Sequence, residues 1–90
     1  MPRYHFHIRD GQDHPDPAGT VLASLDEARN QAVRFAADLL KEAAPHFWTD
    51  GEWSMTVTDD RQMTLFSLTL IGHDAPALAA MPLPLSRSAA

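Results

Sequence analysis

Alternating apolar and polar side chains predict three extended segments of the chain. In residues 3–9 (RYHFHIR), every second side chain is aromatic or aliphatic, and the others are histidine or arginine. The same period of two recurs in residues 52–58 (EWSMTVT) and 63–71 (MTLFSLTLI). This period is typical of strands with one buried face. A shorter stretch at 20–23 (TVLA) predicts a brief additional strand, reached through a loop that begins at Asp10-Gly11.

The segment that follows Ser24 has the spacing of an amphipathic helix. Apolar residues recur at positions 25, 28, 32, 36, 39 and 43, which lie on one helical face. The SLDE sequence at 24–27 predicts the helix start, with the Ser24 hydroxyl accepting from the Glu27 amide and the Glu27 carboxylate accepting from the Ser24 amide. Pro45 predicts that the helix ends near Ala43 or Ala44.

Together these elements predict an α+β domain with the element order β-β-α-β-β. We expect a four-stranded antiparallel sheet in the order 2-1-3-4 with the helix packed on one face, because a right-handed crossover carries the chain over the first strand. The domain is expected to cover residues 1–71, and residues 72–90, which are rich in alanine and proline, to form a flexible tail. The expected core beneath the helix contains Tyr4, Phe6, Ile8, Trp53, Met55, Val57, Phe66, Leu68 and Leu70.

Composition narrows the compartment and the partners. The chain has no cysteine, which excludes disulfides and thiolate chemistry and favours a reducing compartment. No segment approaches the roughly 20 apolar residues that span a bilayer, and we expect no signal peptide, so the expected location is the cytoplasm, without a membrane partner. The net charge of −5, with basic residues scattered along the chain, disfavours nucleic acid as a partner.

The beginning of the chain resembles a known group of proteins. The opening MPRYHFHIRDG, followed by Asp16, Gly19 and Leu22 and then SLDEARNQA, is similar to small bacterial proteins of a domain-of-unknown-function family that open with an M-P-R-Y-x-F-x-[VI]-x-D-G motif. The VTDD sequence at 57–60 is similar to the second hairpin of that group. The resemblance covers residues 1–71 and implies a bacterial cytosolic protein of the β-β-α-β-β plan, without an established activity. Second hairpins in the group often carry glycine near the turn, where this chain has Asp60-Arg61.

His5 and His7 are the candidate metal ligands. Residues i and i+2 of a strand share a face, so two imidazoles can converge on one ion. A third ligand would have to come from a loop or the tail, such as His14, His46, His73 or an aspartate, because the expected sheet face otherwise offers only serine and threonine. The alternative, which we favour, is a polar strand surface that binds neither metal nor cofactor.

The sheet face away from the helix is the predicted interaction surface. A solvated face would hold more lysine and glutamate, whereas this one is nearly uncharged and partly apolar, which is typical of self-association surfaces. We therefore expect a homodimer or another homo-oligomer, with a monomer as the alternative. The expected interface residues are His5, His7, Thr56, Met63, Leu65, Ser67, Thr69 and Ile71.

Three polar residues are predicted to have structural roles. Ser24 and Glu27 cap the helix. Arg29 lies inside the apolar stripe, where its stem packs and its head is expected to reach Asp10, Asp16 or the C-terminal end of a strand. The alternative for Arg29 is an anion site between the helix and the first loop.

Two further groups have a structural and a functional interpretation. The acidic first loop with His14 is expected to be a solvated turn, because it lacks the glycine and ligand spacing of a calcium loop. Phe47 and Trp48 are expected to close the open end of the core, and the alternative is an exposed aromatic patch.

No motif predicts catalysis. The chain has no nucleophile elbow, no glycine-rich phosphate loop and no acid pair that can be placed in a cleft. The leading hypothesis is a non-catalytic interaction or regulatory module that self-associates through the open sheet face. The alternatives are an antitoxin-like regulator associated with nucleic acid, and a metal-binding protein or metalloenzyme that uses His5 and His7.

Overall fold

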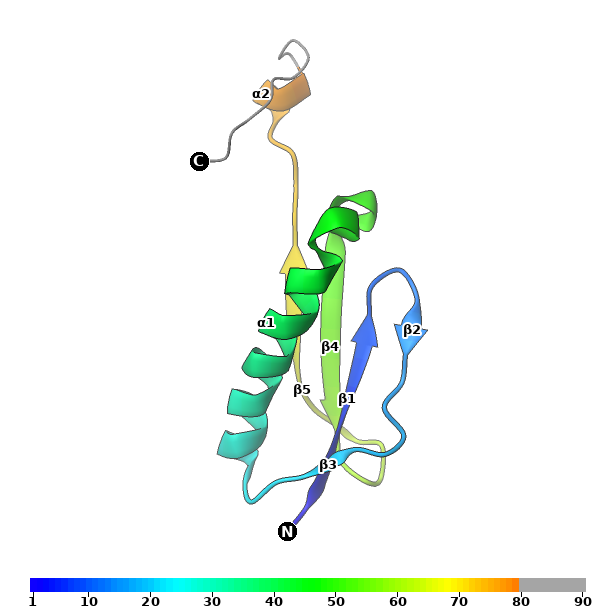
Figure 1. Ribbon diagram of the computed structural model, residues 1–90, viewed down its shortest axis with the longest axis vertical. Helices are drawn as coiled ribbons and strands as arrows, with labels where there is room; N and C mark the ends of the chain where they lie inside the picture. Colours follow the sequence, from blue (N-terminus) through cyan, green and yellow to red (C-terminus); the bar gives the residue numbers. More distant parts are fainter. Residues whose placement is uncertain (80–90) are drawn as a thin grey trace.

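The computed structural model describes residues 1–79 and has an α+β architecture. One long helix, α1 (Leu25–Asp50), packs on one face of an antiparallel sheet, as Figure 1 shows. The strands are β1 (Arg3–Arg9), β2 (Asp13–His14), β3 (Thr20–Val21), β4 (Glu52–Thr58) and β5 (Thr64–Ile71). A short helix, α2 (Pro76–Ala79), follows β5. The predicted α+β class, with an antiparallel sheet and one long helix, is confirmed.

The predicted strand count and order need correction. The sheet has five strands. Four of them follow one another in the order β2-β1-β4-β5, and the fifth, β3, pairs with the beginning of β1. The strand expected at 20–23 is reduced to Thr20–Val21, and β2, which the alternation did not predict, pairs with the end of β1. Pro15 and Pro17 lie between the two short strands and have no backbone N–H to donate to a neighbouring strand. The chain beside β1 therefore forms two short strands, β2 and β3, and not one continuous strand.

The helix begins where the capping sequence predicts. The Ser24 hydroxyl accepts the Glu27 backbone N–H at 3.2 Å, and Ser24 is extended, with φ −155°. The Glu27 carboxylate accepts the backbone N–H of Ala23 at 3.0 Å, one residue before the predicted donor. The first bond serves an amide that the first helical turn leaves without an intrahelical partner, and the second ties the residue before the N-cap to the helix.

The predicted helix end near Ala43 or Ala44 is wrong, because α1 continues through Pro45 to Asp50. A proline inside a helix loses one backbone hydrogen bond and costs roughly 3 kcal/mol. Phe47 packs against the core beyond it. Gly51 then ends the helix in the left-handed conformation, with φ 70°, and donates its N–H to the Phe47 carbonyl at 2.8 Å. These contacts in the last turns offset the loss at Pro45.

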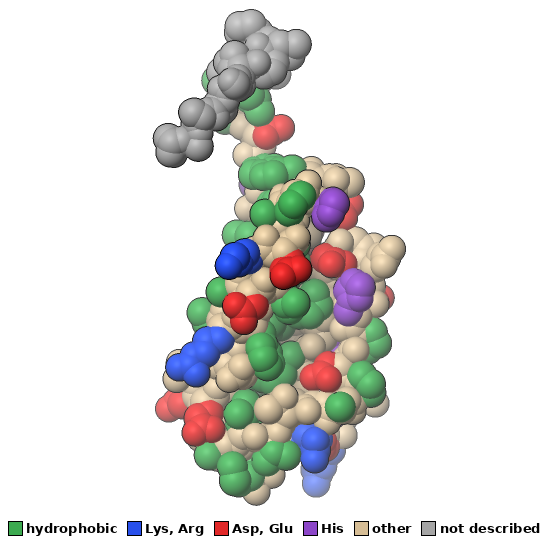
Figure 2. Space-filling model, viewed as in Figure 1, with side chains coloured by type: hydrophobic (Ala, Val, Ile, Leu, Met, Phe, Trp, Pro, Cys, Tyr) green, Lys and Arg blue, Asp and Glu red, His purple; other side chains and the backbone are tan. Residues whose placement is uncertain are grey.

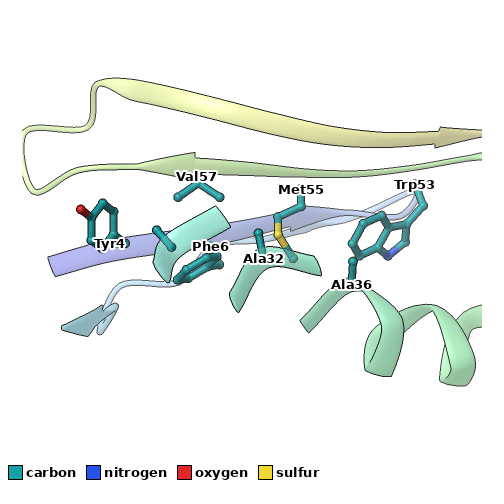
Figure 3. Packing of buried hydrophobic residues seen from close by; sticks show 8 residues of the cluster. Tyr4, Phe6, Ala32, Ala36, Trp53, Met55 and Val57 are labelled. Atoms are coloured by element: carbon teal, nitrogen blue, oxygen red, sulfur yellow. The ribbon is translucent and has the colours of Figure 1, made fainter. Parts of the chain in front are cut away.

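Large side chains from the sheet and small ones from the helix form the core. Figure 3 shows Met55 and Trp53 of β4 directed toward the alanines of α1. The alanines are four residues apart along the helix, so they line one narrow stripe and let α1 approach the sheet closely. The buried hydrophobic residues are Tyr4, Phe6, Ala28, Ala32, Ala36, Trp53, Met55 and Val57.

Some predicted core positions are only partly covered. Ile8, Phe66 and Leu68 are half-buried, and Leu70 is 46% exposed, so its assignment to the core is wrong. The helix packs mainly against β4, which leaves the helix side of β5 partly open. Leu39, on the predicted apolar stripe of the helix, is also exposed, and it borders a hollow beside Ile8 and Trp53.

The chain leaves the sheet at Gly72. The Gly72 N–H donates to the Gly51 carbonyl at 2.9 Å, and the Trp48 ring lies so close that a Cβ at Gly72 would be 2.6 Å from it. Phe47 is half-buried, as expected for a residue that closes the core, whereas Trp48 is exposed. In Figure 1, α2 lies beyond the end of the sheet. Residues 80–90 of the predicted tail lie outside the described residues.

Neither helix within residues 1–79 has the length and apolarity that a membrane crossing requires.

Candidate functional site

His5 lies on the sheet face away from α1, and both of its ring nitrogens have partners. Nδ1 is 2.8 Å from the Asp16 carbonyl oxygen, and Nε2 is 3.0 Å from a carboxylate oxygen of Asp60. Both partners are acceptors, so both nitrogens donate, and the geometry fits the imidazolium form. The hydrogen bond to Asp60, followed by the bond to the Asp16 carbonyl, raises the pKa of His5 above its ordinary value of 6.5. Its side chain is only 14% exposed.

His7 accepts a hydrogen bond at one ring nitrogen, whereas both ring nitrogens of His5 donate. The backbone N–H of Asp16 donates to Nδ1 at 3.1 Å, which places the ring hydrogen on Nε2, where it donates to the Thr58 hydroxyl at 3.0 Å. The rings of His5 and His7 are nearly parallel, with centroids 6.1 Å apart and an interplanar angle of 8°. Thr58, the acceptor for His7, is buried at 7% exposure. The two imidazoles therefore join the first loop to β1 and β4.

Asp16 is the centre of this arrangement. Its carboxylate accepts the backbone N–H groups of Phe6 and Gly19, both at 3.1 Å. Gly19 has φ 68°, and a Cβ there would be 2.9 Å from the His5 ring. We call Asp16, its partners His5, His7 and Phe6, and Gly19 the Asp16 clamp. It explains physically why an aspartate and a glycine stand at two of the positions that carry the family resemblance.

The turn between β4 and β5 positions Asp60 beside His5. The Asp59 carboxylate accepts the N–H groups of Arg61 at 2.8 Å and Met63 at 3.0 Å. The hydrogen bond from Met63 is the main reason that the pKa of Asp59 lies below its usual value. Gln62 takes the left-handed conformation, with φ 64°. A hydrogen-bonded aspartate and one left-handed glutamine thus build the turn without glycine.

The hydrogen bonds of His5 and His7 argue against the metal hypothesis for these residues. All four ring nitrogens already take part in hydrogen bonds with the protein. An ion would have to displace the Asp16 clamp to reach them. Within the described part of the chain, no three histidine, aspartate or glutamate side chains are placed to hold one metal ion.

The predicted interface divides into a covered part and an exposed part. The first loop covers His5 and His7 partly, and Thr56 is also half-buried. The other five predicted residues lie on β5 or just before it, and all are exposed. They are Met63 at 63%, Leu65 at 40%, Ile71 at 52%, and Ser67 and Thr69.

A hollow that the sequence did not predict lies between the last turns of α1 and the hairpin of β1 and β2. It has a volume of about 470 Å³. Its apolar lining consists of Ile8, Leu39, Ala43, Phe47 and Trp53, and its polar lining of Asp10, His14, Glu42, His46, Asp50 and Glu52. Glu42, His46 and Asp50 are four residues apart, a spacing that places them on one helical face only if the helix continues past Pro45. The polar lining includes one close pair, His14 Nε2 to Asp10 Oδ1 at 3.0 Å.

Arg29 does not make its expected contact. Its guanidinium lies 3.8 Å from the Asp26 carboxylate and is 59% exposed, so it reaches neither Asp10 nor Asp16. The alanine stripe turns the Arg29 side of α1 away from the first loop, and the Asp16 carboxylate already has backbone donors.

A family model described as "Domain of unknown function (DUF6894)" matches residues 3–72. The chain belongs to this family. No curated protein and no solved structure matches the chain. The matched DUF6894 range runs from the start of β1 to the residue after β5, so it contains α1, the complete sheet and the Asp16 clamp.

Proposed function

We propose that this DUF6894 chain is a small non-catalytic interaction or regulatory module that self-associates through a surface centred on β5. The supporting observation is the chemistry of that strand. Its sequence TLFSLTLI contains no charged residue, and six of its eight side chains are exposed, including Leu65, Leu70 and Ile71. Leu65 and Ile71 lie on the face away from α1 and Leu70 lies on the helix side, and exposed apolar side chains on a strand without charges are typical of contact surfaces.

The solvent-facing side of α1 has the opposite character. Figure 2 shows acidic and basic side chains interspersed over this side of the molecule. Such a surface stays hydrated and gives no basic stripe for nucleic acid. The contrast supports β5, and not the outer side of the helix, as the contact surface.

The cellular setting is part of the same proposal. The absence of cysteine and the opening MPRYHFHIRDG support a reducing cytoplasm in a bacterium.

Light scattering during size-exclusion chromatography tests the self-association. We expect a mass of at least twice the 9.9 kDa of the chain at two concentrations. A monomer at concentrations on the order of tens of micromolar would contradict the proposal, because it would imply an affinity weaker than about −6 kcal/mol.

A pair of lysine variants locates the surface. Ile71→Lys adds a charge at the proposed contact and should lower the dimer fraction. Asn30→Lys adds the same charge at an exposed position on α1 and should leave the mass unchanged. Equal masses for the two variants would argue against a contact at β5.

A further inference from the structure

We infer that the partner is a second copy of this chain, and that two copies pair antiparallel along the free edge of β5, with Leu68 opposite Leu68 of the second copy. The inference rests on the proposed function, since it gives that self-association a geometry. It follows from the backbone directions in β5, from the side chains on that strand and from the apolar surface beside it.

The hydrogen-bond pattern of the sheet shows which backbone N–H and C=O groups of β5 point away from β4. In an antiparallel ladder, the N–H and C=O of one residue point to the same side, and successive residues alternate. The Gly72 N–H donates to Gly51, across the ladder toward β4. Residues 66, 68 and 70 lie six, four and two positions before Gly72. They therefore also direct their backbone N–H and C=O groups toward β4.

The hydrogen bonds of strand β1 lead independently to the same assignment of backbone directions. The Phe6 N–H donates to Asp16, away from β4, so the neighbouring His7 directs its backbone toward Thr56, its partner on β4. The intervening β4 residues, such as Val57, then point toward β5, where Val57 pairs with Phe66. The backbone groups of Ser67, Thr69 and Ile71 consequently point away from the sheet. Within residues 1–79, no strand pairs with this edge of β5.

This edge lacks the features that usually prevent pairing with another chain. Natural edge strands are commonly short, charged, interrupted by proline or distorted along their length. Strand β5 has eight residues and carries neither a charge nor a proline. Its only register shift is opposite the Val57/Thr58 step, near its beginning.

The strand is complementary to itself when Leu68 lies on the two-fold axis. Each outward-pointing residue then meets another one: Ser67 lies opposite Thr69 of the second copy, and Leu65 lies opposite Ile71. On the helix side, Phe66 lies opposite Leu70. Hydroxyls therefore meet hydroxyls, and apolar side chains meet apolar ones. A two-fold axis of this kind is perpendicular to the sheet, so both α1 helices lie on the same side of the joined sheet.

The same geometry covers apolar surface that a single copy leaves open. Phe35 of α1 packs edge-on against Phe6 of β1, with ring centroids 5.1 Å apart. Val33 and Leu40 lie on the opposite flank of the helix, toward β5. Val33 is 58% exposed and Leu70 is 46% exposed. A second α1 on the same side of the joined sheet would cover this flank and add apolar area to the edge hydrogen bonds.

A single cysteine tests the axis directly, because the natural chain has none. Leu68 would form a non-hydrogen-bonded pair across the axis, with Cα atoms about 4.5 Å apart, which is within disulfide range. We expect Leu68→Cys to give a covalent dimer on mild oxidation. Thr56→Cys, at the middle of the open face on β4, should stay monomeric on a non-reducing gel. A dimer band for Thr56→Cys and none for Leu68→Cys would overturn edge pairing in favour of face-to-face packing.

A proline variant tests the edge hydrogen bonds without a cross-link. Thr69→Pro removes an outward N–H but none of the bonds to β4, so the monomer should fold and the mass should fall from about two chains to one. Thr69→Val keeps the N–H and should keep the dimer. A dimer in Thr69→Pro would overturn the inference and leave self-association intact, whereas a monomeric wild type would overturn both. If Thr69→Pro fails to fold, the Leu68→Cys result decides.

Discussion

The two edges of this sheet differ in the partners of their outward-pointing backbone groups. Along β1, the outward N–H of Phe6 bonds to the Asp16 carboxylate, and β2 and β3 pair with the ends of the strand. Along β5, the outward groups of Ser67 and Thr69 have no partner strand within residues 1–79. A sheet edge is a template for another strand. The chain closes one template with its own loop, and the other is the edge at which we propose pairing with a second copy.

The comparison also gives the histidines a role. A loop with two prolines cannot form a continuous ladder with β1, so side chains have to complete the edge. His5 and His7 hold the Asp16 backbone, and Asp16 in turn holds Phe6 and Gly19. The pair that looked like metal ligands in the sequence is engaged in closing an edge of the sheet.

Breaking the Asp16 clamp should have the largest effect on the closed edge. Asp16→Ala leaves the N–H groups of Phe6 and Gly19 without their acceptor, and we expect a loss of about 2–4 kcal/mol in the free energy of unfolding. Urea denaturation measures it. Asp13→Ala is the matched control: it removes an exposed ion pair with Arg9 and should cost less than about 1 kcal/mol. Similar losses in the two variants would show that the clamp does not hold the edge.

Gly19→Ala should have the next largest effect. The position has φ 68°, and the new Cβ would collide with the His5 ring and the Arg3 side chain. We expect a loss of about 1–3 kcal/mol, with a lower Tm in calorimetry. Ala18→Ser, at the exposed neighbouring position, serves as the control. An unchanged Tm for Gly19→Ala would mean that the loop does not pack on His5.

The smallest expected effect is the pH dependence at His5. Because Asp60 and the Asp16 carbonyl raise the pKa of His5, its protonated form stabilises the fold. This contribution is complete below the unfolded pKa of about 6.5 and is lost as the pH rises through the folded pKa. The stability difference between wild type and His5→Gln should therefore be larger at acidic than at alkaline pH. A pH-independent difference for His5→Gln would contradict the assignment of His5 as the cation.

Local patterns predicted much of the fold. The side-chain parity of β1 and β4 and the cap at Ser24 each depend on neighbours a few residues apart, so a single sequence reveals them. The helix end did not follow from Pro45, because the packing of Phe47 against the core is a tertiary contact that a local pattern does not reveal. The exposure of Leu70 likewise depends on where α1 lies over the sheet.

The candidate site was less accessible to sequence reasoning. His5 and Asp60 are 55 residues apart, and no local pattern links them. The sequence placed His5 and His7 on the correct face but could not show that the first loop folds over them. The charge-free character of β5, in contrast, is readable in TLFSLTLI alone. The predicted order 2-1-3-4 also puts this strand at an edge, and the structure adds which of its backbone groups point away from β4.

Amide hydrogen exchange of β5, followed by NMR in a concentrated sample, tests the open-edge account most directly. Leu68 and Leu70 amides bond to β4 and should exchange slowly in any case. The account predicts that the Ser67 and Thr69 amides, which point outward, are also protected, and that dilution releases them while Leu68 and Leu70 stay slow. Rapid exchange of Ser67 and Thr69 at the highest concentration, beside protected Leu68 and Leu70, would contradict it.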